Sequence, residues 1–185
     1  MKEITRSTFE DFGNTDKVLE ILELVSKELA GNYVVIGGLA VRTYAGKVRK
    51  LTPDLDFLVK PEVEEKVFSL FRLSRNTLCG SVWLVGNVDG VEVDFQVATK
   101  EFENEIIESA ETFCVDDFFI KVAKPEHLIL MKLGVLREKD EMDIALLLKR
   151  KELDLGKLLG LVKTHLPSEI DTLKQFVLMN KLVKE

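Results

Sequence analysis

Two short stretches decide the fold: residues 33–38, YVVIGG, and residues 52–59, TPDLDFLV. The first is an apolar run that ends in two glycines, as a buried strand does where it turns into a helix. The second places Asp54 and Asp56 one residue apart in an otherwise apolar run. Because side chains alternate along a strand, both carboxylates are expected on one face and their apolar neighbours on the other.

A third carboxylate of the same kind follows later in the chain. Residues 82–87 and 91–97 both read as strands, and Asp89-Gly90 between them is a strong hairpin signal. Asp94 lies on the polar face of the second of these strands, opposite its apolar residues. If that strand is a neighbour of the strand at residues 55–59, Asp94 can join the Asp pair.

Three carboxylates on one sheet face point to metal-dependent chemistry. Two of them spaced about 6.5 Å apart along a strand repel each other unless a cation neutralises them. Mg²⁺ with oxygen ligands is the usual partner, and two such ions stabilise both the attacking and the leaving oxygen of an in-line displacement. An isolated Asp-x-Asp is more often a pair of solvated strand or turn residues. The ordered combination of glycine turn, Asp pair and third Asp favours phosphoryl or nucleotidyl transfer.

The glycine turn offers a second element of such a site. Backbone N–H groups at Gly37 and Gly38, at the start of a short helix, can hold phosphate. The turn matches neither a Walker A loop nor Gly-x-Gly-x-x-Gly. Close packing of helix against strand explains a glycine pair equally well. Arg42, Lys47 and Arg49 follow, either as cations for a triphosphate or as an exposed basic loop.

One further cation stands out because it interrupts an apolar helix. Lys132 lies within residues 128–133, which are otherwise apolar. We expect it to serve the nucleotide and not the fold; the alternative is that its stem carries the charge to water. Asp140 is expected to cap a helix, and Asp143 to form an ordinary surface pair beside Lys139.

The chain divides by its pattern into two parts. At 185 residues it fits one domain with a small appendage. Residues 1–123 alternate helices and strands and form an α+β core. Residues 124–185 contain only helices, the last two at 155–165 and 169–183 with Ser168 as the N-cap of the second, and are expected to pack on the core as a C-terminal helical subdomain.

Composition excludes several classes of protein. The chain is 46% hydrophobic and carries a net charge of −6, so it can bury a core, and non-specific binding to nucleic acid or membranes is disfavoured. Its apolar runs are shorter than a membrane span. Cys79 and Cys114 are too few for a disulfide framework and, with the two histidines, show no zinc-ligand spacing. We therefore expect a cytoplasmic protein with reduced cysteines.

The motifs together resemble a known superfamily. Residues 36–40, IGGLA, then 52–56, TPDLD, and then Val93-Asp94 are similar to the nucleotidyltransferases of the DNA polymerase β type. Residues 125–133 and 139–144 resemble the branch that holds the AbiEii-type toxins and related minimal nucleotidyltransferases. The resemblance covers about residues 30 to 150, and aminoglycoside nucleotidyltransferases share the same layout.

The resemblance implies a mixed sheet flanked by helices and a Mg²⁺ or Mn²⁺ site. Its catalytic and metal-binding residues would be Asp54, Asp56 and Asp94, the last as third ligand or as base for the acceptor hydroxyl. The nucleotide-binding residues would be Gly37, Gly38, Lys50, Thr52 and Lys132. Relatives often carry Arg where this chain has Lys50, and His-Gly where it has Ala45-Gly46; Lys cannot form the bidentate contact of Arg.

The function expected from the sequence is transfer of a nucleoside monophosphate from an NTP such as ATP to an acceptor hydroxyl. The acceptor could be tRNA, a protein or a small molecule, as in the aminoglycoside-type enzymes. Two alternatives remain open: an inactive module that keeps the nucleotide pocket, and a toxin whose partner is a cognate antitoxin. The intact set of three Asp favours the enzyme.

Overall fold

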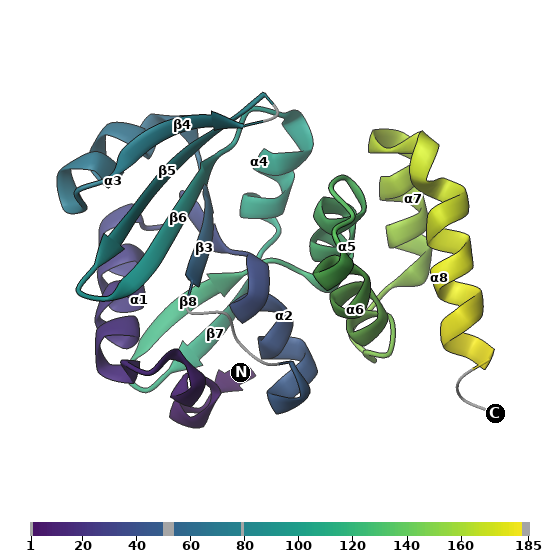
Figure 1. Ribbon diagram of the computed structural model, residues 1–185, viewed down its shortest axis with the longest axis horizontal. Helices are drawn as coiled ribbons and strands as arrows, with labels where there is room; N and C mark the ends of the chain where they lie inside the picture. Colours follow the sequence, from purple (N-terminus) through teal and green to yellow (C-terminus); the bar gives the residue numbers. More distant parts are fainter. Residues whose placement is uncertain (1, 50–53, 79, 183–185) are drawn as a thin grey trace. The chain divides into compact units, whose positions relative to one another are not determined.

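The computed structural model of the chain describes residues 2–49, 54–78 and 80–182, with side chains described to residue 180. It divides into two compact units, Met1–Ala123 and Lys124–Glu185. In the described residues the first unit contains all the strands and the second contains only helices (Figure 1). The predicted fold class, a mixed sheet flanked by helices with helices at the C-terminal end, is confirmed.

One eight-stranded sheet organises the first unit, with the strand order β1-β7-β8-β2-β3-β6-β5-β4. The pairs β1–β7, β2–β8 and β3–β6 are parallel, and the remaining pairs are antiparallel. The central strands are short and almost entirely buried. The strands are β1 (Lys2–Ile4), β2 (Tyr33–Val35), β3 (Asp54–Val59), β4 (Ser74–Leu78), β5 (Ser81–Val88), β6 (Val91–Val97), β7 (Glu111–Val115) and β8 (Phe118–Val122).

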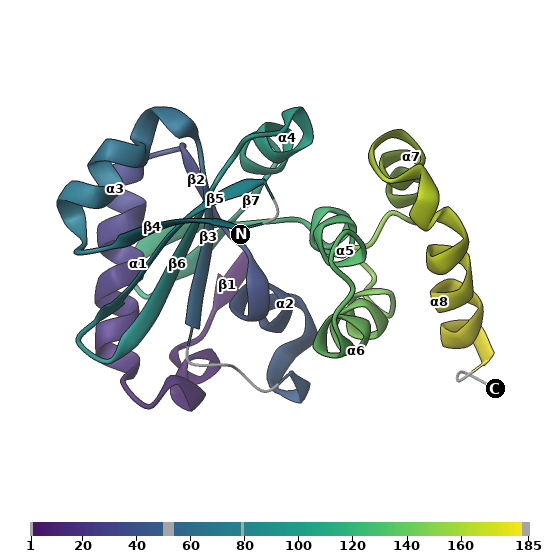
Figure 2. The same cartoon turned by 45° about the horizontal axis from the view of Figure 1, so that its top comes forward.

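Helices cover both faces of this sheet. Figure 2 shows α1 and α3 on one side, and α2 and α4 on the other. The helix α1 begins where Asn14 accepts a hydrogen bond from the Lys17 amide at 3.2 Å, as an N-cap does. The helices are α1 (Thr15–Leu29), α2 (Gly37–Ala45), α3 (Glu64–Leu70) and α4 (Glu101–Glu108), with 3₁₀ turns at Arg6–Thr8, Glu10–Phe12, Gly46–Val48 and Pro61–Val63.

The apolar faces of β3 and β6 form the centre of the core. Phe57 of β3 and Phe95 of β6 are fully buried and stack with their ring centroids 4.8 Å apart. Phe71, which follows α3, adds a third ring 5.5 Å from Phe95. The side chains of these strands therefore alternate as predicted, with the aromatic rings on the side opposite the carboxylates.

The second unit contains α5 (Pro125–Leu133), α6 (Glu138–Leu147), α7 (Leu155–His165), the 3₁₀ turn Pro167–Glu169 and α8 (Ile170–Leu182). The helix α5 packs against α6 and α7, and α8 against α6 and α7. Asp154 caps α7 by accepting from the Lys157 amide at 2.9 Å, while its own amide donates to the Glu126 carboxylate at 2.6 Å. The expectation that this unit packs on the core stays a prediction.

Several local predictions can be scored. The hairpin at Asp89-Gly90 is confirmed, and both residues have the positive φ angles, 50° and 92°, that such a turn requires. Ser168 does not cap the last helix, because it lies within the 3₁₀ turn and α8 begins at Ile170.

The edge strands β1 and β4 were not predicted. No helix in the described residues has the length and apolarity needed to cross a membrane.

Candidate active site

The pairing of β3 with β6 sets the three predicted carboxylates side by side. These two strands are parallel and in register, with Asp56 opposite Asp94 and Asp54 opposite Glu92. Neighbouring strands lie about 4.8 Å apart, and residues paired in register point to the same face. Asp54, Asp56 and Asp94 therefore share one sheet face, and each of the three is partly accessible to solvent.

The glycine turn lies directly against this carboxylate group. The amide of Ile36, at the end of β2, donates to the Asp56 carbonyl at 2.9 Å, and the chain then turns into α2. Gly37 has a φ of +64°, and a Cβ atom there would lie 1.8 Å from Asp56 Oδ2. A residue with a Cβ atom could not approach the carboxylate this closely, and glycine also adopts the positive φ without strain. The glycine pair therefore does more than pack a helix on a strand: it brings the first turn of α2 to Asp56.

The crowding of these carboxylates raises the pKa of one of them. Burial raises the pKa of the Asp94 carboxyl, and the negative charges of Asp54 and Glu92 raise it further. Asp54 Oδ1 is buried and has no hydrogen-bond partner among the described residues. A buried carboxylate oxygen without a donor is costly, and a cation is one way to satisfy it.

The oxygen atoms of these carboxylates are suitable ligands for a divalent cation, but the side chains are not arranged as a complete metal site. Mg²⁺ prefers oxygen ligands from several carboxylates. Asp54 Oδ1, which is buried without a hydrogen-bond donor, is one such ligand atom. In the described part of the chain, however, no three His, Cys, Asp or Glu side chains are arranged so that they could hold a metal ion. Metal binding here would therefore require the carboxylates to rotate toward a common point.

The other residues considered as nucleotide ligands lie in different surroundings. Gly38 is buried in the first turn of α2, next to Gly37. Lys50 and Thr52 lie outside the described residues. Arg42, considered as a cation for phosphate, is 2% exposed and donates to Asp11 and to the Arg49 carbonyl, so it fastens the loop to the N-terminal segment.

Lys132 takes part in a buried charge cluster of the second unit. Its Nζ atom lies 2.9 Å from Asp140 Oδ1 and 2.7 Å from Asp143 Oδ2, and its side chain is 10% exposed. Arg137 adds a hydrogen bond from its Nε to Asp140 Oδ2 at 2.8 Å. The expectation that Lys132 has no task in the fold is wrong, because it neutralises two carboxylates that are almost fully buried. Its contact with nucleotide stays a prediction.

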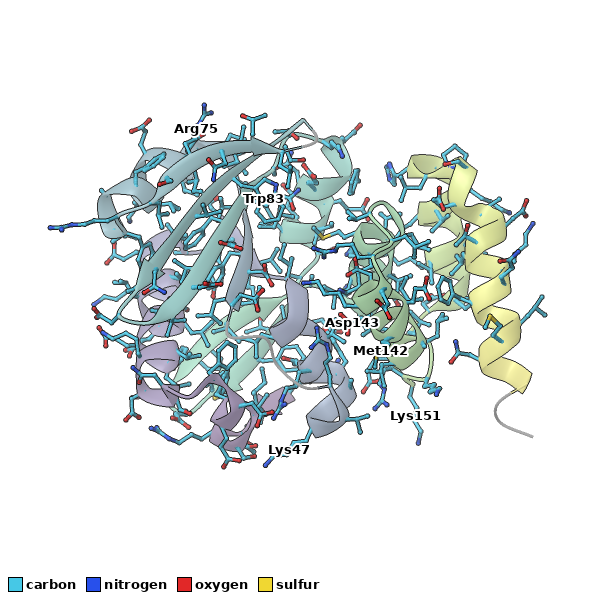
Figure 3. All side chains as sticks on the ribbon, in the orientation of Figure 1. Lys47, Arg75, Trp83, Met142, Asp143 and Lys151 are labelled. Atoms are coloured by element: carbon cyan, nitrogen blue, oxygen red, sulfur yellow. The ribbon has the colours of Figure 1, made fainter. Side chains whose placement is uncertain are left out.

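The two aspartates of this cluster also differ from expectation. Asp140 is not the N-cap of α6; it lies in the first turn and accepts from the amide of Arg137, which holds the cap position. Asp143 is not a surface residue paired with Lys139, since its side chain is 1% exposed and paired with Lys132. Figure 3 shows Asp143 on α6. Sequence spacing could not reveal these pairs, because they join two different helices.

The lowered pKa of Asp140 in this cluster predicts that the protein loses stability in acid. Burial raises the pKa of Asp140, but hydrogen bonds from Arg137 and Lys132 outweigh it and lower the pKa from 3.8 to about 2. A carboxyl whose pKa is lower in the folded state stabilises the protein above its unfolded pKa and loses this contribution as the pH falls toward the folded pKa. We expect the free energy of unfolding, measured with urea between pH 5 and about pH 2, to fall by on the order of 2 kcal/mol more in the wild type than in Asp140→Asn. Equal slopes for the two proteins would contradict the assignment.

One buried polar network was missed in the sequence. Glu103 of α4 accepts from the amides of Thr99 and Lys100 and, at 2.8 Å, from Gln96 of β6. Gln96 lies on the same strand face as Asp94, so this network fastens α4 to the carboxylate side of the sheet. A glutamate at the third position of a helix was the available signal, since such a residue often caps the helix start.

A carboxylate group on adjacent parallel strands, facing a glycine turn at a helix start, defines the class of the protein: a nucleotidyltransferase fold. The chain belongs to the family described as "Nucleotidyltransferase of unknown function (DUF6036)", which it matches over residues 15–181. No protein of curated function matches the sequence.

Two solved structures share the fold at low sequence identity. The lincosamide antibiotic adenylyltransferase LnuA, with lincomycin bound, is 17% identical, and the match covers 72% of this chain and 96% of that one with a TM-score of 0.54. The antibiotic-resistance factor ANT(2'')-Ia is 12% identical, with 85% of this chain and 96% of that one covered and a TM-score of 0.50.

Proposed function

We propose that the protein transfers a nucleoside monophosphate from an NTP to an acceptor hydroxyl. The observation that carries this proposal is the register of Asp56 with Asp94, together with the approach of the Asp56 carboxylate to Gly37. In this arrangement the Asp56 carboxylate lies against the first turn of α2, and Asp94 lies beside Asp56 on the next strand. A triphosphate needs both, namely ligands for the cations that accompany it and backbone donors for its oxygens.

Each residue then has a distinct task. Asp54 and Asp56 would hold Mg²⁺ or Mn²⁺, which supplies neutralisation of the charge that develops on the phosphates. The amides of Gly37 and Gly38 would donate to phosphate oxygens. Asp94 would accept the acceptor's hydroxyl proton; its raised pKa makes it a stronger base than an ordinary aspartate. A new bond forms between the acceptor oxygen and the α-phosphorus, the bond to the β-phosphate breaks, and pyrophosphate leaves.

The test is a transfer assay with the purified protein. Each of the four α-labelled NTPs would be incubated with Mg²⁺ or Mn²⁺ and, separately, with total RNA, with protein and with small molecules from a cell extract. We expect label in one of the three pools and release of pyrophosphate. NTP binding without transfer to any pool would favour the inactive nucleotide-binding module, and absence of both would overturn the proposal. A cognate antitoxin and kinship with AbiEii-type toxins stay predictions.

A small-molecule acceptor is the form of this activity that the fold neighbours favour. LnuA was solved with the antibiotic lincomycin bound. At 17% identity the likeness extends only to the fold, and lincomycin is therefore one compound to test in the small-molecule arm of the assay. Aminoglycosides are tested beside it, because the sequence resembles the aminoglycoside nucleotidyltransferases.

Gly37 provides a test that separates backbone strain from contact with the site. Gly37→Ala would force a Cβ into the Asp56 carboxylate at a φ of +64°, whereas Gly31→Ala, at the end of α1, also has a positive φ, +86°, but open space around its Cβ. Both should lose roughly 1–2 kcal/mol of stability because alanine is strained at a positive φ, and Gly37→Ala should lose more because its Cβ meets the Asp56 carboxylate. We expect only Gly37→Ala to weaken NTP binding in calorimetric titrations. Equal NTP affinities in the two variants would show that the Gly37–Asp56 approach does not serve the nucleotide.

A further inference from the structure

The N-terminal segment, residues 2–12, is anchored in the core of the first unit. Its strand β1 pairs in parallel with β7, and the side chains of Ile4, Phe9 and Phe12 are buried. The match to the family begins at residue 15 and does not include this segment. Because its apolar side chains are buried, the segment has a fixed position from which its charged residues can hold other elements.

Two acidic residues of this segment contact the helix that begins at the glycine turn and the loop after it. Asp11 Oδ2 accepts a hydrogen bond from Arg42 Nη1 of α2 at 2.5 Å. Glu10 Oε2 lies 3.0 Å from the Nζ atom of Lys47, which is labelled in Figure 3. The Arg42 side chain is 1% exposed, whereas those of Glu10 and Lys47 are each 62% exposed. An exposed ion pair contributes little, so the Asp11–Arg42 pair is the one that can hold α2 in place.

Arg42 also joins Asp11 to the loop that leads to the Asp pair. Its Nη1 atom donates a second hydrogen bond, at 2.9 Å, to the carbonyl oxygen of Arg49. Residues 46–48 of this loop are exposed, so burial of apolar surface does not fix them. The hydrogen bond from Arg42 therefore holds the loop at a point five residues before Asp54.

The position of Arg42 in the chain connects it with both stretches that are expected to bind nucleotide. It follows Gly38 by four residues, so the two lie on the same side of α2. Arg49, which it contacts, directly precedes Lys50, a predicted nucleotide ligand. One guanidinium group thus links the N-terminal segment to the helix of the glycine turn and to the loop before the Asp pair.

Stability alone does not account for an arginine at this position. The Nε atom of Arg42 is buried and has no hydrogen-bond partner among the described residues. A buried donor without an acceptor is costly, and replacing a buried ion pair by apolar side chains of similar volume is often neutral or stabilising. The arrangement of the loop and α2 that Arg42 maintains is therefore the better explanation for its charge.

We propose that Arg42 and Asp11 are positioning residues for the nucleotide, because their ion pair keeps α2 and the loop at residues 46–49 in the arrangement that NTP binding requires. This inference rests on the proposed function, since it presupposes an NTP at the glycine turn. It deepens that function by making NTP affinity depend on the N-terminal segment, without assigning this segment a contact with the nucleotide.

The NTP affinity of Asp11→Asn tests the inference without any need for catalysis. The Asp11 side chain is 50% exposed, so the variant is expected to fold, and circular dichroism checks this. In calorimetric titrations with a non-hydrolysable NTP and Mg²⁺, we expect the Kd to rise at least about fivefold, the lower end of the coupling between separate sites. Removal of a negative charge would by itself favour an anion, so long-range electrostatics predicts the opposite change. A Kd equal to that of the wild type would overturn the inference.

The matched control is Asp16→Asn, at the start of α1. It removes the same charge from an exposed ion pair with Arg6, another residue of the N-terminal segment. We expect the Kd for NTP to stay at the wild-type value. An increase as large as that in Asp11→Asn would show that the effect does not depend on the contact with Arg42, and would also overturn the inference.

A double variant separates positioning of the nucleotide from stability of the fold. Arg42→Met combined with Asp11→Asn removes both charges and keeps an unbranched apolar side chain at position 42. We expect a free energy of unfolding close to that of the wild type, while the Kd for NTP stays raised at least about fivefold. Arg42→Lys, which keeps the charge, should recover part of the affinity. A double variant that binds NTP as tightly as the wild type would confine Arg42 to the fold and overturn the inference. If the double variant does not fold, Asp11→Asn decides.

Kinetics distinguish failure of this inference from failure of the proposed function. In Asp11→Asn the KM for NTP should rise, with the KM for the acceptor unchanged, because the pair positions the nucleotide. Transfer by the wild type together with an unchanged KM for NTP in Asp11→Asn would overturn the inference and leave the proposed function standing. A wild type that neither binds nor transfers any NTP would overturn both.

Discussion

Asp54→Asn should abolish nucleotidyl transfer without destabilising the protein. Replacing the carboxylate by an amide of the same shape removes a proposed metal ligand, and we expect kcat/KM to fall at least about 100-fold, as when one preorganised electrostatic group is lost. The free energy of unfolding without nucleotide should stay constant or rise, because the charge repulsion between Asp54 and Asp94 disappears. The measurements are transfer rates at saturating Mg²⁺ and urea unfolding of both proteins.

The same variant tests whether the carboxylates face one another. Because Asp54 contributes to the raised pKa of Asp94, that pKa should fall in Asp54→Asn when the Asp94 carboxyl is followed by NMR titration. The matched control is Asp89→Asn, an exposed position in the β5–β6 turn at a φ of 50°, a conformation that asparagine adopts readily. It should leave both transfer and the Asp94 pKa unchanged. A transfer rate in Asp54→Asn close to that of the wild type would remove Asp54 from the site.

Nucleotide binding supplies an independent readout of the same site. NTP with Mg²⁺ at about 100 times the dissociation constant should stabilise the wild type by roughly 2.7 kcal/mol through mass action. Asp56→Asn is expected to lose the Mg²⁺-dependent part of this stabilisation. Equal thermal shifts for wild type and variant would count against Asp56 as a metal ligand.

The comparison of sequence with structure shows where local patterns suffice. The alternation in residues 54–59 and 91–97 predicted that Asp54 and Asp56 share one face of their strand and that Asp94 lies on the polar face of its own; the parallel register of β3 with β6 then joins the two faces. The turn at Asp89-Gly90 followed from residues that tolerate positive φ. Each of these signals depends on neighbours within a few residues, which is the range over which periodicity and turn chemistry act.

Features that depend on distant partners or on exposure could not be predicted in this way. The strand β4 is exposed along its whole length, so its sequence has no alternating pattern of apolar residues from which a strand could be predicted. Lys132 stood out correctly as a charge in an apolar helix, but its partners Asp140 and Asp143 belong to another helix. The same signal, a lysine among leucines, is compatible with a buried ion pair and with a phosphate ligand.

Lys132→Met should destabilise the second unit strongly. The substitution keeps an apolar stem but leaves Asp140 and Asp143, each 1% exposed at the side chain, without the lysine between them. Removing one partner of a buried ion pair costs roughly 3–5 kcal/mol, because the remaining charge is left uncompensated. Urea unfolding followed by circular dichroism would measure this loss. The control is Lys174→Met in α8, whose pair with Asp171 is exposed and is expected to contribute less than about 1 kcal/mol.

A compensated variant then separates the role of Lys132 in stability from a role in nucleotide binding. Lys132→Met combined with Asp140→Asn and Asp143→Asn removes the uncompensated charges, so it should recover most of the stability lost by Lys132→Met alone. If Lys132 also contacts phosphate, this folded variant binds a non-hydrolysable NTP with Mg²⁺ more weakly than the wild type by roughly 1.5–3 kcal/mol, the range for a hydrogen bond to a charged group. Matching affinities would confine Lys132 to the ion cluster. Failure of the compensated variant to regain stability would show that the cost of Lys132→Met does not arise from the buried carboxylates.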